Sequence, residues 1–175
     1  LDTTIQGVEE GNADYYTMTR HDNPALAEYA LGSYGRNADN DYTCPDDLVG
    51  ESHGDGEIVG GMLWELREAL GPTKVDHLQY GALSGSQMHT FADYAASVSA
   101  YAELMMNETG ELQFTQADVD LVNQVLEERG LVDCERIVDL WVDGAAVSKL
   151  HYGSFDITQG QGTPSSLQYR ATTME

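Results

Sequence analysis

The sequence predicts a mainly α-helical fold on three observations. Apolar residues recur at helical spacing in several separate segments. Loops rich in Gly, Asn and Asp divide those segments, and hydrophobic residues make up 41% of the 175 residues, enough for the core of one domain. After about Asp143 the composition turns to Thr, Ser, Gln and Gly, which is typical of extended chain. We therefore expect a helical domain over residues 1–143 and an extended tail or linker over residues 144–175.

In the N-terminal third, the sequence predicts two helices and a loop. The segment from about Thr4 to Tyr16 is expected to be helical, with apolar residues set among acidic ones. Residues 24–31 are expected to form a short second helix, because proline is well suited to the first turn of a helix. Residues 32–52 are expected to be a loop, since the run NADNDYTCPDD has no periodic apolar pattern.

Three longer helices are expected downstream. Residues 56–70 carry the clearest periodic apolar pattern, and Gly71-Pro72 is expected to end that helix. A long helix is expected over residues 86–106. The run from Thr115 to Asp118 is close to a capping box, with Asp in place of Glu, and Gly130 is expected to close the helix that follows.

The charge balance limits the partners of this protein. There are 30 acidic residues against 8 basic ones, for a net charge of -22. Such a surface repels nucleic acid and anionic membranes, and no apolar run is long enough to cross a bilayer. We therefore expect no nucleic-acid and no membrane partner. The acidic residues either form a solvated surface or bind hard cations such as calcium, for which the loop from Asp39 to Asp47 is the candidate.

The two cysteines, Cys44 and Cys134, suit one disulfide in an oxidising compartment, and two buried thiols are the alternative. No pair or cluster with histidine has the spacing of a structural zinc site. The sequence starts at Leu1 within what already resembles folded sequence, without an initiating Met or a signal peptide. We therefore expect that further residues precede Leu1 in the protein.

Glu10 and Asp14 are the first residues that could carry chemistry. They stand four positions apart in the first predicted helix, so both carboxylates project from one face. In a zinc site one such carboxylate can ligate the metal, while the other holds a ligand histidine through its second ring nitrogen. The alternative is an incidental pair, because acidic residues at this spacing are common in so acidic a chain.

His53 is the second candidate. It stands just before the helix predicted over residues 56–70, between glycines that keep the backbone open. A protonated imidazole there could donate to an oxyanion as charge develops. The alternatives are a helix cap, a solvent-exposed side chain, or a metal site shared with Glu57. The remaining histidines lack a partner at an informative spacing; they are His21, His77, His89 and His151.

Two segments taken together resemble the gluzincin metallopeptidases, the broad group of thermolysin and fungalysin. The segments are GVEEGNADYY (residues 7–16) and HGDGEIVGGMLWELREALG (residues 53–71). In that group a His-Glu-x-x-His helix is followed by a helix with a Glu-Gly-x-Ala-Asp-Tyr-type motif. Glu10 falls on its zinc-ligand glutamate, Asp14 on the aspartate that orients one zinc histidine, and His53 on the histidine that stabilises the tetrahedral intermediate. The resemblance covers roughly residues 5–140 and implies the helical C-terminal subdomain of a thermolysin-like catalytic domain.

The resemblance implies two further roles. Arg36, in SYGRNADND, stands near the place of the arginine that binds the substrate carbonyl. The family histidine is paired with an aspartate, for which this sequence offers Asp46, Asp47 and Glu51 as candidates.

One element of the family pattern is missing from this sequence: no His-Glu-x-x-His motif is present. In the family's order that motif would precede Leu1, and it holds two zinc ligands and the general base. We therefore expect the chain to be a fragment of a secreted zinc metalloendopeptidase that acts on peptides or proteins. It needs zinc ligands from an upstream segment and is inactive alone, with calcium as a possible second metal. The rival readings are a non-catalytic helical remnant and a calcium-binding or adhesive module.

Overall fold

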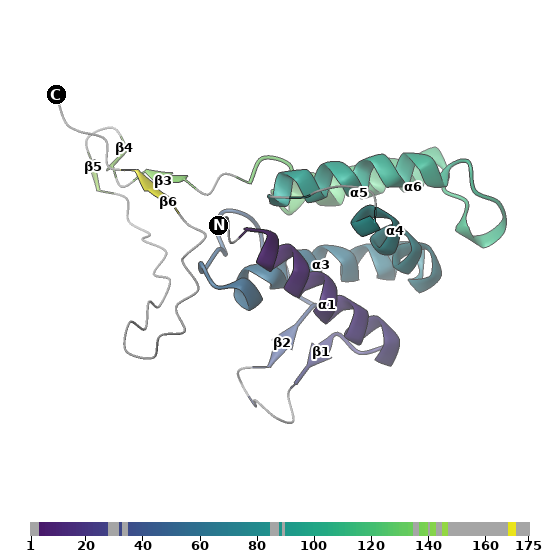
Figure 1. The fold of residues 1–175 in the computed structure, drawn as a ribbon, viewed down its shortest axis with the longest axis horizontal. Helices are drawn as coiled ribbons and strands as arrows, with labels where there is room; N and C mark the ends of the chain where they lie inside the picture. The colour runs from purple at the N-terminus through teal and green to yellow at the C-terminus, as the bar shows by residue number, and fades with distance from the viewer. Residues whose placement is uncertain are drawn as a thin grey trace.

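The structure, a computed structural model, describes residues 4–27, 32, 35–84, 88, 90–134, 137–139, 141–142, 145–146 and 168–170. Most of these residues lie in five α-helices (Figure 1), so the predicted mainly α-helical class is confirmed. The helices are α1 (Thr4–His21), α3 (Ser52–Leu70), α4 (Pro72–Ser84), α5 (Phe91–Met105) and α6 (Gln116–Glu128). A short 3-10 turn, Gly110–Leu112, lies between α5 and α6. No helix in the described ranges is long and apolar enough to cross a membrane.

Helices α1 and α3 lie side by side (Figure 1) and approach closely through glycine. A Cβ placed on Gly56 of α3 would lie 2.9 Å from the backbone nitrogen of Gly11 and 3.0 Å from the carbonyl oxygen of Gly7, both in α1. A Cβ on Gly11 would in turn meet the carbonyl oxygen of Gly56. The backbones of the two helices therefore approach each other directly, and Glu10 is brought beside the first turn of α3.

Helix α3 begins four residues earlier than the apolar pattern predicts. Glu51 is its N-cap, and the Glu51 carboxylate accepts a hydrogen bond from the backbone nitrogen of Gly54 at 2.9 Å. Burial favours a higher pKa for Glu51, but the N–H groups of Gly54 and His53 outweigh it and the pKa is lowered. His53 is consequently the second residue of α3, and the expectations that it precedes the helix or caps it are wrong.

Gly71-Pro72 does end α3 as predicted, but a helix that the sequence analysis did not anticipate follows at once. Gly71 has φ 88°, a conformation that favours glycine, and Pro72 is the first residue of α4. Val75, Leu78 and Ala82 of α4 are buried. The φ of proline is already fixed near the helical value, and the N–H group that proline lacks would have no intrahelical partner in the first turn, so proline can start a helix as well as stop one.

Helix α6 follows its predicted boundaries, whereas α5 begins later than predicted. Thr90 caps α5, so the first residue of this helix is Phe91 rather than residue 86, which lies outside the described residues. Thr115 and Asp118 form the predicted capping box of α6, with the Thr115 hydroxyl accepting from the Asp118 N–H and the Asp118 carboxylate accepting from the Thr115 N–H. Gly130, with φ 65°, closes α6 as expected.

The short helix predicted over residues 24–31 is wrong for the part that the structure describes. Strand β1 (Ala25–Leu26) pairs antiparallel with β2 (Arg36–Asn37), and Ala27 has φ 62°, outside the helical region. The N–H of Ala38 donates to the carbonyl of Pro24 at 2.9 Å and extends the pairing. A hairpin therefore follows α1, and it carries Arg36 back toward that helix.

The predicted extended tail, residues 144–175, lies mostly outside the described residues. Two described pieces of it are strands, β5 (Ala145–Ala146) and β6 (Gln168–Arg170). β5 pairs antiparallel with β4 (Trp141–Val142), and β6 pairs parallel with β3 (Ile137–Asp139).

Buried polar contacts, in addition to apolar packing, join α1 to α4 and α5. The Tyr15 hydroxyl donates to Asp76 of α4 at 2.8 Å, and the Tyr94 hydroxyl of α5 donates to the Asn12 side chain at 2.7 Å. Burial raises the pKa of both tyrosines, so both hydroxyls keep their protons. The largest fully buried side chains are Tyr15, Leu48, Ile58, Met62, Leu63, Leu66, Leu78, Phe91, Tyr94, Met105, Leu126 and Leu131.

Candidate functional site

Glu10 of α1 and His53 of α3 meet at one end of the α1–α3 pair. Nδ1 of His53 lies 3.1 Å from Oε2 of Glu10, without the alignment of a hydrogen bond. Nδ1 is itself buried, whereas 43% of the His53 side chain and 38% of the Glu10 side chain are exposed. The exposure of His53 therefore comes from its other ring atoms, so the pair forms a contact that is half open to solvent.

Asp14 and Arg36 form a second ion pair one turn along α1. Nη2 of Arg36 donates to Oδ1 of Asp14 at 2.8 Å, and Nε donates to Oδ2. The Arg36 side chain is only 20% exposed, and the Asp14 side chain is only 9% exposed. Hydrogen bonding to Asp14 raises the pKa of Arg36, and the charges of Glu10 and Glu57 add to the rise. The Arg36 guanidinium is thus hydrogen-bonded to Asp14 and interacts electrostatically with Glu10 and Glu57.

Glu57, one turn beyond His53 in α3, interacts with both Arg36 and strand β2. Its Oε1 accepts a hydrogen bond from the backbone nitrogen of Asn37 in β2 at 3.1 Å. Burial raises the pKa of Glu57, and Asp14 and Glu51 raise it further, against the opposing effects of the Asn37 N–H and Arg36. Glu57 thus ties β2 to α3, whereas the ion-pair contact of His53 is with Glu10.

The four site residues expected from the sequence are therefore close in space: Glu10, Asp14, Arg36 and His53. The ion-pair contact of the His53 ring is with Glu10, and of the three expected candidates Glu51 interacts electrostatically with His53. Asp47 accepts from the backbone nitrogen of Thr43 at 2.8 Å, Glu51 caps α3, and Asp46 is exposed.

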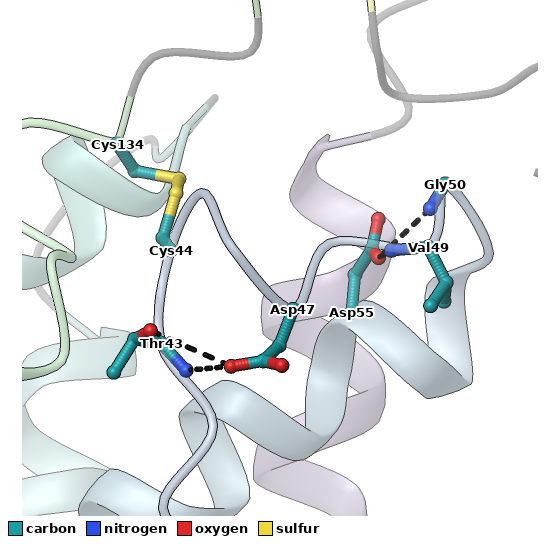
Figure 2. Close-up of a disulfide and its surroundings, with 7 residues drawn as sticks. All are labelled: Thr43, Cys44, Asp47, Val49, Gly50, Asp55 and Cys134. Atoms are coloured by element: carbon teal, nitrogen blue, oxygen red, sulfur yellow. Dashed lines mark hydrogen bonds between the residues drawn. A yellow bond between two sulfur atoms is a disulfide. The ribbon is translucent and has the colours of Figure 1, made fainter. Parts of the chain in front are cut away.

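The loop that leads into His53 is fixed by a buried carboxylate (Figure 2). Oδ1 of Asp55, a residue only 1% exposed, accepts from the backbone nitrogens of Val49 at 2.7 Å and Gly50 at 3.0 Å. Farther back, Cys44 is bonded to Cys134, which is the first of the two alternatives expected for these cysteines. The loop between Arg36 and His53 is thus held at Cys44 by the disulfide and at Val49 and Gly50 by Asp55. These contacts fix the position of the first turn of α3.

Arg129, at the end of α6, anchors the same loop, and the sequence analysis did not single it out. Its guanidinium donates to the carbonyl oxygens of Asn40 at 2.7 Å and Tyr42 at 3.1 Å, and it forms an ion pair with Glu65 of α3. The N–H of Cys44 donates to the Arg129 carbonyl at 2.9 Å. A lone arginine beside a closing glycine has no sequence pattern that reveals such contacts.

A complete metal site is not formed within the described ranges. No group of three or more His, Cys, Asp or Glu side chains there could hold a metal ion. This applies to the loop from Asp39 to Asp47 and to the pairing of His53 with Glu57. The Glu10 carboxylate, half exposed beside an imidazole, can serve as one ligand of a zinc ion whose other ligands come from elsewhere.

Comparison with known proteins identified no matching family model, no matching curated protein and no matching solved structure.

Proposed function

We propose that this chain is the helical C-terminal part of a secreted zinc metallopeptidase, and that a segment preceding Leu1 supplies the remaining zinc ligands and the general base. The proposal is carried by one observation: a carboxylate of α1 and the imidazole at the start of α3 lie 3.1 Å apart. Arg36 and Asp14 lie one turn away. These are the four residues that the resemblance to the gluzincins singles out.

Each residue has a role that its surroundings permit. Glu10 would ligate zinc through a carboxylate oxygen, and the bound ion would activate a water molecule and polarise the substrate carbonyl. His53 donates a hydrogen bond to the oxyanion from its ring edge away from Nδ1, because Nδ1 faces Glu10. Its position in the first turn of α3, fixed by the Asp55 loop, keeps that edge in place.

Arg36 positions the substrate by donating to a peptide carbonyl. Asp14 uses two of the five N–H donors of the guanidinium, which leaves others for a ligand. The Asp14 carboxylate has further lone pairs with which to hold a zinc-ligand histidine of the preceding segment. The ion pair thus holds both groups in orientation before substrate arrives.

The disulfide and the acidic surface support the proposed location outside the cell. A disulfide between Cys44 and Cys134 is expected to persist in an oxidising environment such as the outside of a cell. The strongly acidic surface suits solubility there.

The alternative is a non-catalytic helical remnant, and the Asp14–Arg36 pair is the observation that favours it. Loss of either partner of an ion pair this well covered would destabilise the fold whether or not peptides are cleaved.

The test uses the protein with its preceding segment, a quenched fluorescent peptide and added zinc. We expect hydrolysis that 1,10-phenanthroline abolishes and zinc restores. Glu10→Gln should lose both zinc and activity, whereas His53→Phe should keep zinc and lower kcat by a factor on the order of one hundred to one thousand. The control is Glu68→Gln, at an exposed position of α3, which should change neither property.

Residues 1–175 alone should bind zinc weakly and turn over no substrate. Full activity of Glu10→Gln, or hydrolysis that 1,10-phenanthroline does not inhibit, would exclude the zinc mechanism. No hydrolysis by the protein with its preceding segment would favour the remnant.

A further inference from the structure

A second feature of α1 is a groove that faces α4 and does not involve Glu10, Asp14, Arg36 or His53. Its volume is about 640 Å³. Glu9, Ala13 and Tyr16 line it from α1, and Asp76, Tyr80 and Leu83 line it from α4. Pockets that hold small ligands span about 300–1,000 Å³, so the groove is large enough to bind a ligand of that size.

The groove presents two aromatic rings to solvent. Tyr16 is 61% exposed and Tyr80 is 71% exposed, although both are large side chains. Tyrosine is enriched at the centre of binding surfaces, because it combines apolar area with a hydroxyl group. The face of the ring also attracts cations. Leu83 and Ala13 add apolar surface beside the rings.

The charges of the groove favour a cation. Glu9 and Asp76 contribute carboxylates, and no Lys, Arg or His lies among the residues that line it. The Asp76 carboxylate is held in position, since its Oδ1 accepts from the hydroxyls of Tyr15 at 2.8 Å and Thr19 at 2.9 Å.

A second copy of this chain is a poor occupant. Its net charge of -22 opposes association with an equally acidic surface. Four of its cations are already ion-paired; they are Arg36, Arg67, Lys74 and Arg129.

We propose that the groove between α1 and α4 binds a cationic amphipathic peptide segment. An apolar side chain of that segment packs on Leu83 and Ala13. A neighbouring lysine or arginine lies over the rings of Tyr16 and Tyr80, with its charge toward Glu9 and Asp76. The groove would bind such a peptide whether or not the Glu10 site holds zinc.

The probe is a fluorescein-labelled peptide of leucine and lysine at helical spacing, about 14 residues long so that it can form a helix on binding. A matched peptide carries glutamine in place of lysine. Binding is measured by fluorescence anisotropy at roughly 0.15 M salt, where long-range attraction is screened. We expect saturable binding of the lysine peptide and at least tenfold weaker binding of the glutamine peptide, a difference of about 1.4 kcal/mol.

Variants distinguish the groove from the rest of the acidic surface. Tyr80→Ala should weaken binding about tenfold, as loss of an aromatic anchor does at other interfaces, and Tyr80→Phe should retain most of it. Tyr42→Ala removes another exposed tyrosine, 40% exposed and outside the groove, and should change nothing. Thermal unfolding of each variant checks that the fold persists.

Three results would overturn the proposal. They are absence of binding to the natural protein, an equal loss in Tyr80→Ala and Tyr42→Ala, and equal binding of the lysine and glutamine peptides. Because zinc is absent from every arm, failure here leaves the peptidase proposal intact, and failure of that proposal leaves this one intact.

Discussion

Gly11 of α1 and Gly56 of α3 face one another so closely that a Cβ on Gly56 would lie 2.9 Å from the backbone nitrogen of Gly11. This approach sets the spacing of the two helices. Glu10 directly precedes Gly11, and His53 lies one turn before Gly56, so the same approach brings the Glu10 carboxylate to 3.1 Å from the His53 ring.

The first prediction concerns that approach. Gly11→Ala should lower the free energy of unfolding by about 2 kcal/mol, because the added methyl group overlaps the Gly56 carbonyl and would lie 2.8 Å from Cβ of Val59. Urea denaturation measures the loss. Gly60→Ala is the matched control on the same helix pair, since its Cβ would meet only the Gly11 carbonyl oxygen, at 3.8 Å. That control should be neutral or stabilising by up to about 1 kcal/mol; a loss equal to that of Gly11→Ala would refute the role of close approach.

The second prediction concerns the Asp14–Arg36 pair. Arg36→Ala should destabilise the fold by about 2 kcal/mol, because it leaves the Asp14 carboxylate, only 9% exposed, without its partner. Adding Asp14→Asn to Arg36→Ala should recover part of the loss, since the buried charge is then gone. A double-mutant cycle in urea gives the coupling. Arg20→Ala, at an exposed position of α1, should change stability by less than about 0.5 kcal/mol. Additive effects of the two site substitutions would contradict the coupling.

The third prediction concerns pH. Burial raises the folded-state pKa of Glu57 above its value in the unfolded chain. Between the two pKa values the folded state binds more protons, so this residue lowers stability as pH rises through that window. Glu57→Gln keeps an oxygen that can accept from the Asn37 N–H but has no charge. It should therefore be more stable than the natural protein at neutral pH.

The gain should shrink as pH falls and vanish below the pKa of an unfolded glutamate, about 4.3. Chemical unfolding across that range measures it. Glu68→Gln, which removes an exposed charge from the same helix, should give a small change without this pH profile. A gain of Glu57→Gln that stays constant with pH would contradict the assignment.

The sequence alone determined the features that depend on neighbouring residues. The helical class follows from periodic apolar positions, and the capping box of α6 follows from Thr115 and Asp118 three positions apart. The grouping of Glu10, Asp14, Arg36 and His53 was expected only through resemblance to a family, and the roles of these residues stay a prediction. Helix α4 was within reach as well, because Pro72 followed by Val75, Leu78 and Ala82 is itself a helical pattern.

Only the tertiary structure decided the features that depend on distant contacts. Residues 24–27 have helical composition, yet β2 offers Ala25 and Leu26 backbone partners that local sequence cannot reveal. His53 enters the helix because the Glu51 side chain caps it, and its ring nitrogen faces Glu10 because glycines let α1 and α3 approach. Arg129 gains its role from backbone carbonyls of a loop far away in the chain. Local propensity is a free-energy preference of a few tenths of a kcal/mol to about 1 kcal/mol per residue. Tertiary packing and buried hydrogen bonds contribute as much or more, so they override local propensity where the two favour different conformations.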